Sequence, residues 1–410
     1  MISGSASSHY SRIAERAVSC RAAWLLVLIA LLHPQALLAE GPAVLIGLTA
    51  ELDHPTSAAG QAIRAGIRTA IADINAAGGV LPGRRLELVE RDDRGLPARG
   101  ADNFRELAAM PAVAGIFAGA SASLGNDLVK AADSLKTPIL IPWVGADPDP
   151  VSESPARYVF RLAVSERESM RLILQDARQR GYRRIAVLLP TNAWGRRAAK
   201  EAVAMSKLGD SSGVIEAHWY ETPGRSLVPP YRAALERGAD SLVLIMNESD
   251  TRILLRELAA NPEIARLPLY LHWTAMAGRK ALAMSAEEQG FDLSVVFPGM
   301  AESRQSAAVL ERIARQLPDQ YSGVVPVPGA ALQAYDLTRL LAAAITRSGG
   351  GDRAAVRGAL MNSGEYRGAL KQYRNPYSGG SRDALGASDI AVFRLRSDGS
   401  LDDNRSKPRR

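Results

Sequence analysis

From residue 43 onward, the chain alternates short apolar runs with longer segments in which apolar residues recur every three or four positions. The segment 57–79 shows the second pattern, with isoleucines at helical spacing and Gly78-Gly79 as a C-terminal stop. The same alternation begins again near residue 158. Strands that alternate with helices pair in parallel, so the predicted fold class is α/β, with two Rossmann-like lobes of parallel strands flanked by helices.

The apolar runs place the expected strands along the chain. Each is short and bounded by polar residues, glycine or proline, which is typical of strands buried in a parallel sheet. The predicted strands are 43–50, 85–93, 113–119 and 138–143 in the first series, and 183–190, 214–221, 240–249 and 267–273 in the second, which starts after the apolar run 158–164. The run 294–301 follows, and 388–399 is predicted as a strand with a turn.

The first 39 residues have the pattern of a secretory signal peptide. Arg12, Arg16 and Arg21 precede an apolar stretch at 22–32, and small residues follow up to Ala39. The apolar stretch is shorter than the roughly 20 residues that span a bilayer, which disfavours the alternative of an uncleaved anchor. We therefore predict an exported, periplasmic protein.

Composition restricts the chemistry of the exported chain. The only cysteine, Cys20, precedes the apolar stretch, so lipid attachment, disulfides and thiolate chemistry are all disfavoured. The 410 residues suggest two domains. The net charge of +7 comes partly from a basic tail, predicted to be disordered over 401–410. The sequence has no basic cluster interleaved with aromatic residues, so we expect no nucleic-acid partner.

The sequence GASAS at 119–123 lies between a predicted strand and a predicted helix. A helix start presents free N–H groups, and Ser121 and Ser123 add hydroxyl donors, so this turn is a candidate site for a carboxylate. Equally, either serine could cap its own helix. A serine-hydrolase elbow would need glycine at position 123, and no histidine of the exported chain lies in a recognisable motif.

Three tryptophans lie at the carboxyl ends of predicted strands: Trp143 and Trp273 each end a strand, and Trp194 follows the strand 183–190. Ligands of open α/β sheets bind beyond these ends, so the three indoles are candidates to line a cleft, the alternative being ordinary packing. No phosphate-binding loop, dinucleotide fingerprint or metal-ligand spacing is present. We therefore expect no cofactor and no metal.

These residues resemble a known family. The stretch 46–108, the segments GIFAGASAS, RRIAVLLPTNAWG and GAALQAYDLTRLL, and the stretch 375–399 are similar to the leucine/isoleucine/valine-binding proteins, the type I periplasmic solute-binding proteins of ABC transporters. The resemblance covers nearly the whole exported chain and implies two lobes joined by three crossing strands. Its implied boundaries are 42–160 and 299–386 for lobe one, and 161–298 and 387–400 for lobe two.

The resemblance also implies a ligand site between the lobes. Family members hold the ligand carboxylate with a serine after the third strand, which Ser123 matches best with Ser121 beside it, and with the loop after the fourth strand, here Trp143, Val144 and Gly145. The aromatic residue after the first strand of lobe two corresponds to Trp194.

One feature departs from the family pattern. Amino-acid binders carry an acid in the loop that here reads TAMAGRK and has none, which puts an α-amino acid ligand in doubt; Glu248 or Asp250 is a candidate substitute. The implied function is non-enzymatic capture of a small-molecule ligand, an amino acid or a related carboxylate or amide, for delivery to ABC permease subunits in the inner membrane. The alternative implied by the same fold is the ligand-sensing domain of a signalling or regulatory system.

Overall fold

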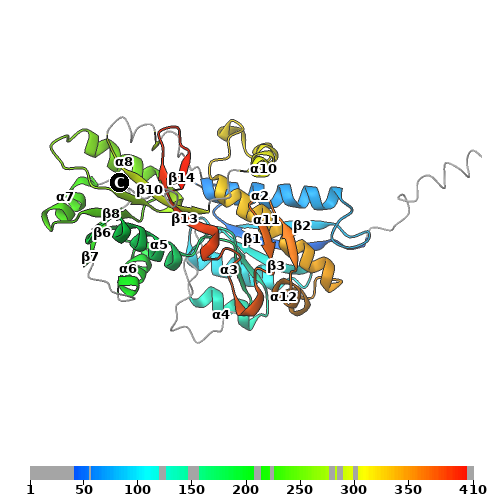
Figure 1. Ribbon diagram of the computed structural model, residues 1–410. Helices are drawn as coiled ribbons and strands as arrows, with labels where there is room; N and C mark the ends of the chain where they lie inside the picture. Colours follow the sequence, from blue (N-terminus) through cyan, green and yellow to red (C-terminus); the bar gives the residue numbers. More distant parts are fainter. Residues whose placement is uncertain are drawn as a thin grey trace, which may run out of the picture.

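The computed structural model shows two β-sheets in separate halves of the molecule, each flanked by helices (Figure 1). The α/β fold with two Rossmann-like lobes is confirmed. Among the residues that the structure describes, no helix is both long and apolar enough to cross a membrane. The signal predicted over 1–39 lies outside the described residues, which are 41–54, 57–119, 126–145, 157–206, 214–221, 226–276, 282–283, 290–298 and 303–403.

Lobe one is built on a five-stranded parallel sheet with the strand order β2-β1-β3-β4-β5. Its central strands are buried along nearly their whole length, as expected for a sheet covered on both faces. The apolar runs noted in the sequence are these strands: β1 (Val44–Ala50), β2 (Leu86–Asp92), β3 (Val113–Ala118), β4 (Ile139–Ile141) and β5 (Val159–Arg161).

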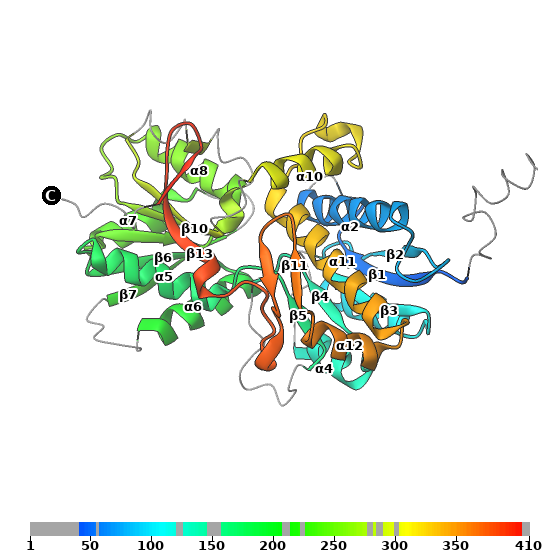
Figure 2. The same ribbon diagram turned by 45° about the vertical axis from the view of Figure 1, so that its right-hand side comes forward.

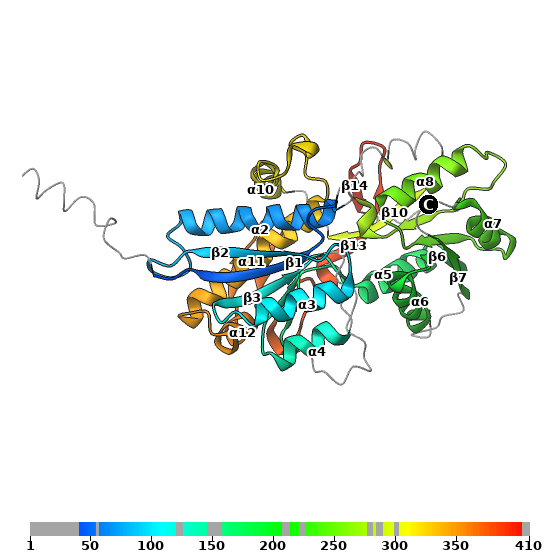
Figure 3. The ribbon, with the colours of Figure 1, turned by 180° about the vertical axis from the view of Figure 1, so that it is seen from behind.

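Helices cover both faces of this sheet, with α2 and α11 on one side and α3 and α4 on the other (Figure 3). Helix α2 ends where the glycine pair predicted, because Gly78 and Gly79 take φ of 105° and 87°. At Gly66 a Cβ would lie 2.3 Å from the carbonyl oxygen of Ala331, so glycine lets α2 approach α11 closely. The helices are α2 (Ala58–Ala76), α3 (Pro97–Ala108), α4 (Asn126–Ser134), α10 (Arg304–Ala314), α11 (Pro328–Ser348) and α12 (Arg353–Met361).

Lobe two is built on a seven-stranded sheet with the order β14-β13-β10-β9-β8-β6-β7. The strands from β10 to β7 are parallel, whereas β13 and β14 are antiparallel at one edge. The strands are β6 (Arg184–Pro190), β7 (Val214–Tyr220), β8 (Ser241–Leu244), β9 (Leu269–Leu271), β10 (Leu293–Pro298), β13 (Ile390–Leu395) and β14 (Leu401–Asp403), and the helices are α5 (Glu166–Gln179), α6 (Ala193–Ser206), α7 (Val228–Glu236) and α8 (Glu248–Ala259).

The chain passes between the two sheets three times: after β5, after β10 and before β13. Figure 2 shows the crossing segments between the lobes. The first and third crossings pair with each other, since the buried Arg161 guanidinium forms a bidentate ion pair with Asp383, and Arg161 N–H donates to the carbonyl of Arg382 at 2.7 Å. These segments connect the two lobes, and we use the name hinge for them. The exact lobe boundaries given above remain predictions.

The remaining elements were not expected from the sequence. A two-stranded hairpin packs on lobe one, and the described part of the chain contains four short 3₁₀ helices. The tail predicted from residue 401 requires a correction: its first three residues form β14, because a turn with Gly399 at φ 83° returns the chain onto β13. The hairpin strands are β11 (Glu365–Arg367) and β12 (Gln372–Arg374), and the 3₁₀ helices are η1 (Trp273–Met276), η2 (Asp319–Tyr321), η3 (Ser378–Gly380) and η4 (Ala387–Asp389).

Candidate functional site

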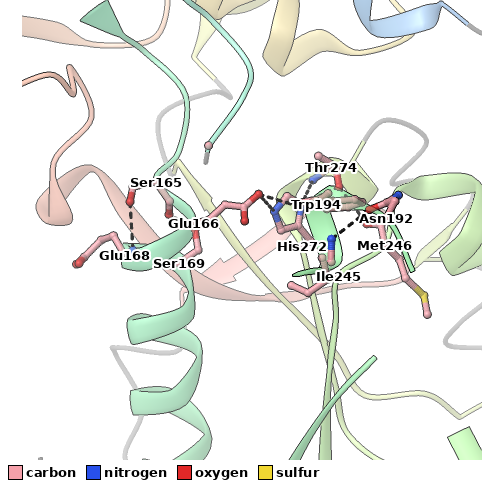
Figure 4. Close-up of polar contacts among 12 residues, drawn as sticks. Ser165, Glu166, Glu168, Ser169, Asn192, Trp194, Ile245, Met246, His272 and Thr274 are labelled. Carbon is pink, nitrogen blue, oxygen red and sulfur yellow. Dashed lines mark hydrogen bonds and ion pairs between the residues drawn. The ribbon is translucent and has the colours of Figure 1, made fainter. Parts of the chain in front are cut away.

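The candidate site lies at the carboxyl ends of the strands of lobe two, where α5, α6 and η1 begin (Figure 4). Ligands of open α/β sheets bind at such edges. Helix α5 starts at this edge because its C-terminus must reach the opposite edge of the sheet, where β6 begins. The side chain of Ser165 accepts a hydrogen bond from the Glu168 N–H at 3.3 Å, which caps the helix, and acidic residues in the first turn complement its dipole.

Glu166, the first residue of α5, extends towards Trp194 and His272 (Figure 4). It is 8% exposed, and its Oε1 accepts a hydrogen bond from the indole Nε1 of Trp194 at 2.8 Å. Trp194 lies in the first turn of α6, after β6. A buried carboxylate is stabilised when it accepts such bonds, so the pairing satisfies both groups.

His272 and Trp273 follow β9 and pack against this pair. The His272 ring meets Trp194 edge to face at 5.0 Å between centroids and stacks at a tilt on Trp273 at 3.5 Å. Nδ1 of His272 lies 2.7 Å from the Thr274 hydroxyl. Nε2 lies 3.8 Å from Oε1 of Glu166, too far for a hydrogen bond, and has no hydrogen-bond partner among the described residues. Burial lowers the pKa of His272 to about 3, so the ring is neutral at pH 7.

Gly145, in the loop after β4 of lobe one, completes the group. A Cβ at this position would lie 2.6 Å from two ring atoms of Trp273 and 2.2 Å from the carbonyl oxygen of Val164, so only glycine fits. The Gly145 carbonyl accepts hydrogen bonds from the Glu166 N–H at 3.0 Å and from Nη1 of Arg161 at 2.8 Å. The loop that the sequence placed at the ligand site is thereby bound to the hinge.

The contacts form a closed circuit: Gly145 to Glu166, Glu166 to Trp194, Trp194 to His272, His272 to Trp273, and Trp273 back to Gly145. We call these five residues the edge circuit. It joins one loop of lobe one to three segments of lobe two. A small hollow of about 10 Å³, with room for roughly one water molecule, adjoins it between α5 and α6, lined by Glu166, Ser169, Met170, Ile173, Ala198, Glu201, Ile245 and His272.

The structure brings some predicted site residues together and separates others. Gly145, Trp194 and Trp273 meet in the edge circuit, but Trp273 is only 1% exposed, so its ring is enclosed by protein. Trp143 is half-buried and packs at Gly329 where α11 begins. The remaining predicted residues lie elsewhere: Val144 packs against a cluster of buried lobe-one residues that includes Phe104 and Val113, and Glu248 forms an ion pair with Arg252 on its own helix. Ser121 and Ser123 lie outside the described residues. A ligand role for each of them remains a prediction.

Sequence reasoning missed Glu166 and gave His272 no role. The helix dipole by itself favours an acidic residue in the first turn of a helix. Nothing in the local sequence therefore marked Glu166 as a partner of Trp194. His272 directly precedes Trp273 at a strand end, a signal that could have been used. Within the described part of the chain, no three acidic or histidine side chains gather as a metal site would require.

The buried His272 predicts a pH dependence of stability. Its folded-state pKa of about 3 is below the ordinary value near 6.5, so as the pH falls from 6.5 towards 3 the unfolded chain takes up the proton first and stability is lost. From pH 7 to pH 5 this contribution is about 2 kcal/mol. Burial raises the pKa of Asp336 to about 6, which acts in the opposite direction.

Because the two groups oppose each other, the measurement compares His272→Phe with the unaltered protein. Urea titrations at pH 7 and at pH 5 give the change in unfolding free energy on acidification. The variant is expected to lose less stability on acidification than the unaltered protein, because it lacks the His272 contribution. Equal pH dependence in the two proteins would show that His272 is not held neutral by burial.

The sequence matches the family described as "Periplasmic binding protein" over residues 43–400. No curated protein matches the chain by sequence. Solved structures are similar at low identity: a periplasmic binding protein type 1 from Bordetella pertussis Tohama I has a TM-score of 0.71 at 18% identity, covering 90% of this chain and 99% of that one.

Two further structures are similar. A leucine binding protein, LivK, from Thermotoga maritima MSB8 has a TM-score of 0.67 at 17% identity, covering 88% of this chain and 97% of its own. An ABC transporter substrate-binding protein from Desulfitobacterium hafniense in complex with Leu has a TM-score of 0.65 at 18% identity, covering 88% and 99%. At these identities the likeness shows the fold.

Proposed function

This chain belongs to the periplasmic binding protein family, and from that premise we propose that it is the exported substrate-binding component of an ABC transporter. Its ligand is a small organic solute, a branched-chain or other amino acid or a related carboxylate or amide. Its partners are that solute and the permease subunits of the inner membrane. The observation that carries the proposal is the edge circuit, which joins a strand-end loop of lobe one to the strand ends of lobe two beside a hinge.

The mechanism is closure of the two lobes over the ligand. A ligand shifts the balance towards a closed form only through contacts that it makes better there. The ligand carboxylate is held by Ser123 and Ser121 at the helix start after β3, and by N–H groups of the loop at Trp143, Val144 and Gly145. The Gly145 carbonyl already accepts two hydrogen bonds, so this residue offers the ligand its N–H. Trp194 and Trp143 form the aromatic wall, and the enclosed Trp273 supports Trp194 through the His272 ring.

Two further points support this proposal. The similar protein from Thermotoga maritima is described as a leucine binding protein, and the one from Desulfitobacterium hafniense was solved in complex with Leu. The family and the fold are those of binding proteins rather than enzymes. In the alternative role, as a sensor, the same lobes would report ligand to a kinase or regulator. A permease and an ATPase encoded beside this chain favour transport, and a histidine kinase or transcription regulator there favours sensing.

The ligand class is testable by thermal shift, because a ligand that binds only the folded state stabilises it by about 2.7 kcal/mol at 100 times its Kd. The panel contains leucine, isoleucine and phenylalanine. It also contains the analogues of these that lack the amino group, 4-methylpentanoate, 3-methylpentanoate and 3-phenylpropanoate, and the amides of these three acids. We expect at least one class to raise the melting temperature without being consumed. A response to the amino acids alone shows that an ammonium partner exists despite the missing acid.

The controls separate capture from catalysis. Ser123→Ala is expected to lower affinity for the compound that binds, with no turnover in either form. Chromatography of the compound after incubation measures turnover. Hydrolysis that disappears in Ser121→Ala or Ser123→Ala would instead establish an enzyme, and a flat response to the whole panel would contradict the proposed ligand class.

A further inference from the structure

Glu166 contacts both lobes through different atoms. Its backbone N–H donates to the carbonyl of Gly145 in lobe one at 3.0 Å, while its Oε1 accepts from Nε1 of Trp194 in lobe two at 2.8 Å. The residue is 8% exposed, so neither contact competes freely with water. A hydrogen bond to a buried carboxylate is stronger and more directional than one between neutral groups. Glu166 is therefore able to fix the angle of the Trp194 indole.

The surroundings of Trp194 leave that angle dependent on Glu166. The indole is only partly buried and lies in the first turn of α6, where no preceding helical turn restricts its rotamer. His272 meets the indole edge to face at 5.0 Å and bounds it on one side. The bond to Oε1 fixes the nitrogen edge, so the two contacts together determine which face the indole turns outward.

The anchor of Glu166 is itself rigid. Its N–H is bound to Gly145, whose carbonyl also accepts from the buried Arg161, the residue that pairs with Asp383 in the hinge. The position of the Trp194 indole is thus set relative to the loop of lobe one rather than to α6 alone. A ligand bound between that loop and the indole would therefore contact an indole at a fixed distance from the loop.

We propose that Glu166 is a positioning residue that holds the Trp194 indole, through Oε1, in the orientation used for ligand contact. This inference rests on the proposed function, because it assigns Trp194 to the ligand site. Glu166 acts through Trp194, and its own oxygen is engaged by the indole rather than by the solute. Glu166, the first residue of α5, would thereby determine ligand affinity without contacting the ligand.

The first test needs no ligand. In ¹⁵N-labelled protein the indole N–H signal of Trp194 is identified by its loss in Trp194→Phe. Glu166→Ala is expected to move that signal and to speed its exchange with solvent, whereas Glu166→Gln, which retains a carbonyl acceptor, restores most of the original position. The matched control is Glu168→Ala, two residues along the same turn, where the side chain pairs with the exposed Arg171. This control should leave the Trp194 signal unchanged.

The second test measures affinity for the panel compound with the largest thermal shift. Glu166→Ala should weaken its binding about tenfold, and the same change should have little further effect in a Trp194→Phe background, because the two residues act as one unit. An unchanged Trp194 signal in Glu166→Ala, or an equal affinity loss in both backgrounds, overturns the inference. If Glu166→Ala does not fold, rapid solvent exchange of the Trp194 indole N–H in the unaltered protein overturns it instead. If no panel compound binds, the proposed ligand class fails while the indole signal still decides the positioning role.

Discussion

Trp194→Ala is expected to weaken ligand binding about thirtyfold, which corresponds to about 2 kcal/mol. The expected loss is large because an indole offers a broad apolar face at low entropic cost, and because truncation also removes the edge contact with His272 and leaves the Glu166 carboxylate without its indole donor. Isothermal titration of the panel compound that binds measures the change.

Trp219→Ala is the matched control for this experiment. Trp219 is 41% exposed on β7, the outer strand of the lobe-two sheet, where it pairs with Leu189 of β6 and has no contact with Glu166 or His272 among those described for Trp194. It removes an indole of the same size without touching the edge circuit, so affinity should remain within about twofold, as for surface changes in general. Equal effects at the two positions, or no effect at Trp194, would remove Trp194 from the ligand site.

Asp336→Ala is expected to lower the free energy of unfolding by about 4 kcal/mol. Asp336 lies on α11 with no exposed surface, and its carboxylate accepts hydrogen bonds from the N–H groups of Ala369 and Leu370 and from the hydroxyl of Tyr373. Each buried donor left without a partner costs about 1–3 kcal/mol, and removal of a buried charge offsets part of the sum. Urea titration at pH 7 measures the loss.

Asp352→Ala provides the comparison for Asp336. Asp352 accepts from the Ala355 N–H at 2.8 Å and caps α12 near the surface, so its loss should cost only about 1 kcal/mol. Asp336 lies within the lobe-one core and joins α11 to the β11–β12 hairpin, and a Cβ on Gly368 would lie 2.3 Å from its Oδ2. Similar losses in the two variants would mean that the hairpin is not held by the buried carboxylate.

Much of the fold followed from local patterns in the sequence. The buried apolar runs became β1, β3, β6 and β8, and the isoleucine spacing and glycine pair gave α2 with its end. Such patterns are visible because burial on one or both faces imposes a period on neighbouring residues. The β11–β12 hairpin escaped notice since each of its strands has three residues, too few to show a period.

The sequence by itself determined the α/β alternation, the strand ends and therefore the edge at which Trp194 and Trp273 lie. Only the tertiary structure decided which residues meet there. Glu166 and Trp194 are 28 residues apart, and Arg161 and Asp383 are 222 apart, and both pairs depend on how the chain crosses between the lobes. A local period reports that a side chain is buried, but the partner it is buried against is set by the packing of distant segments.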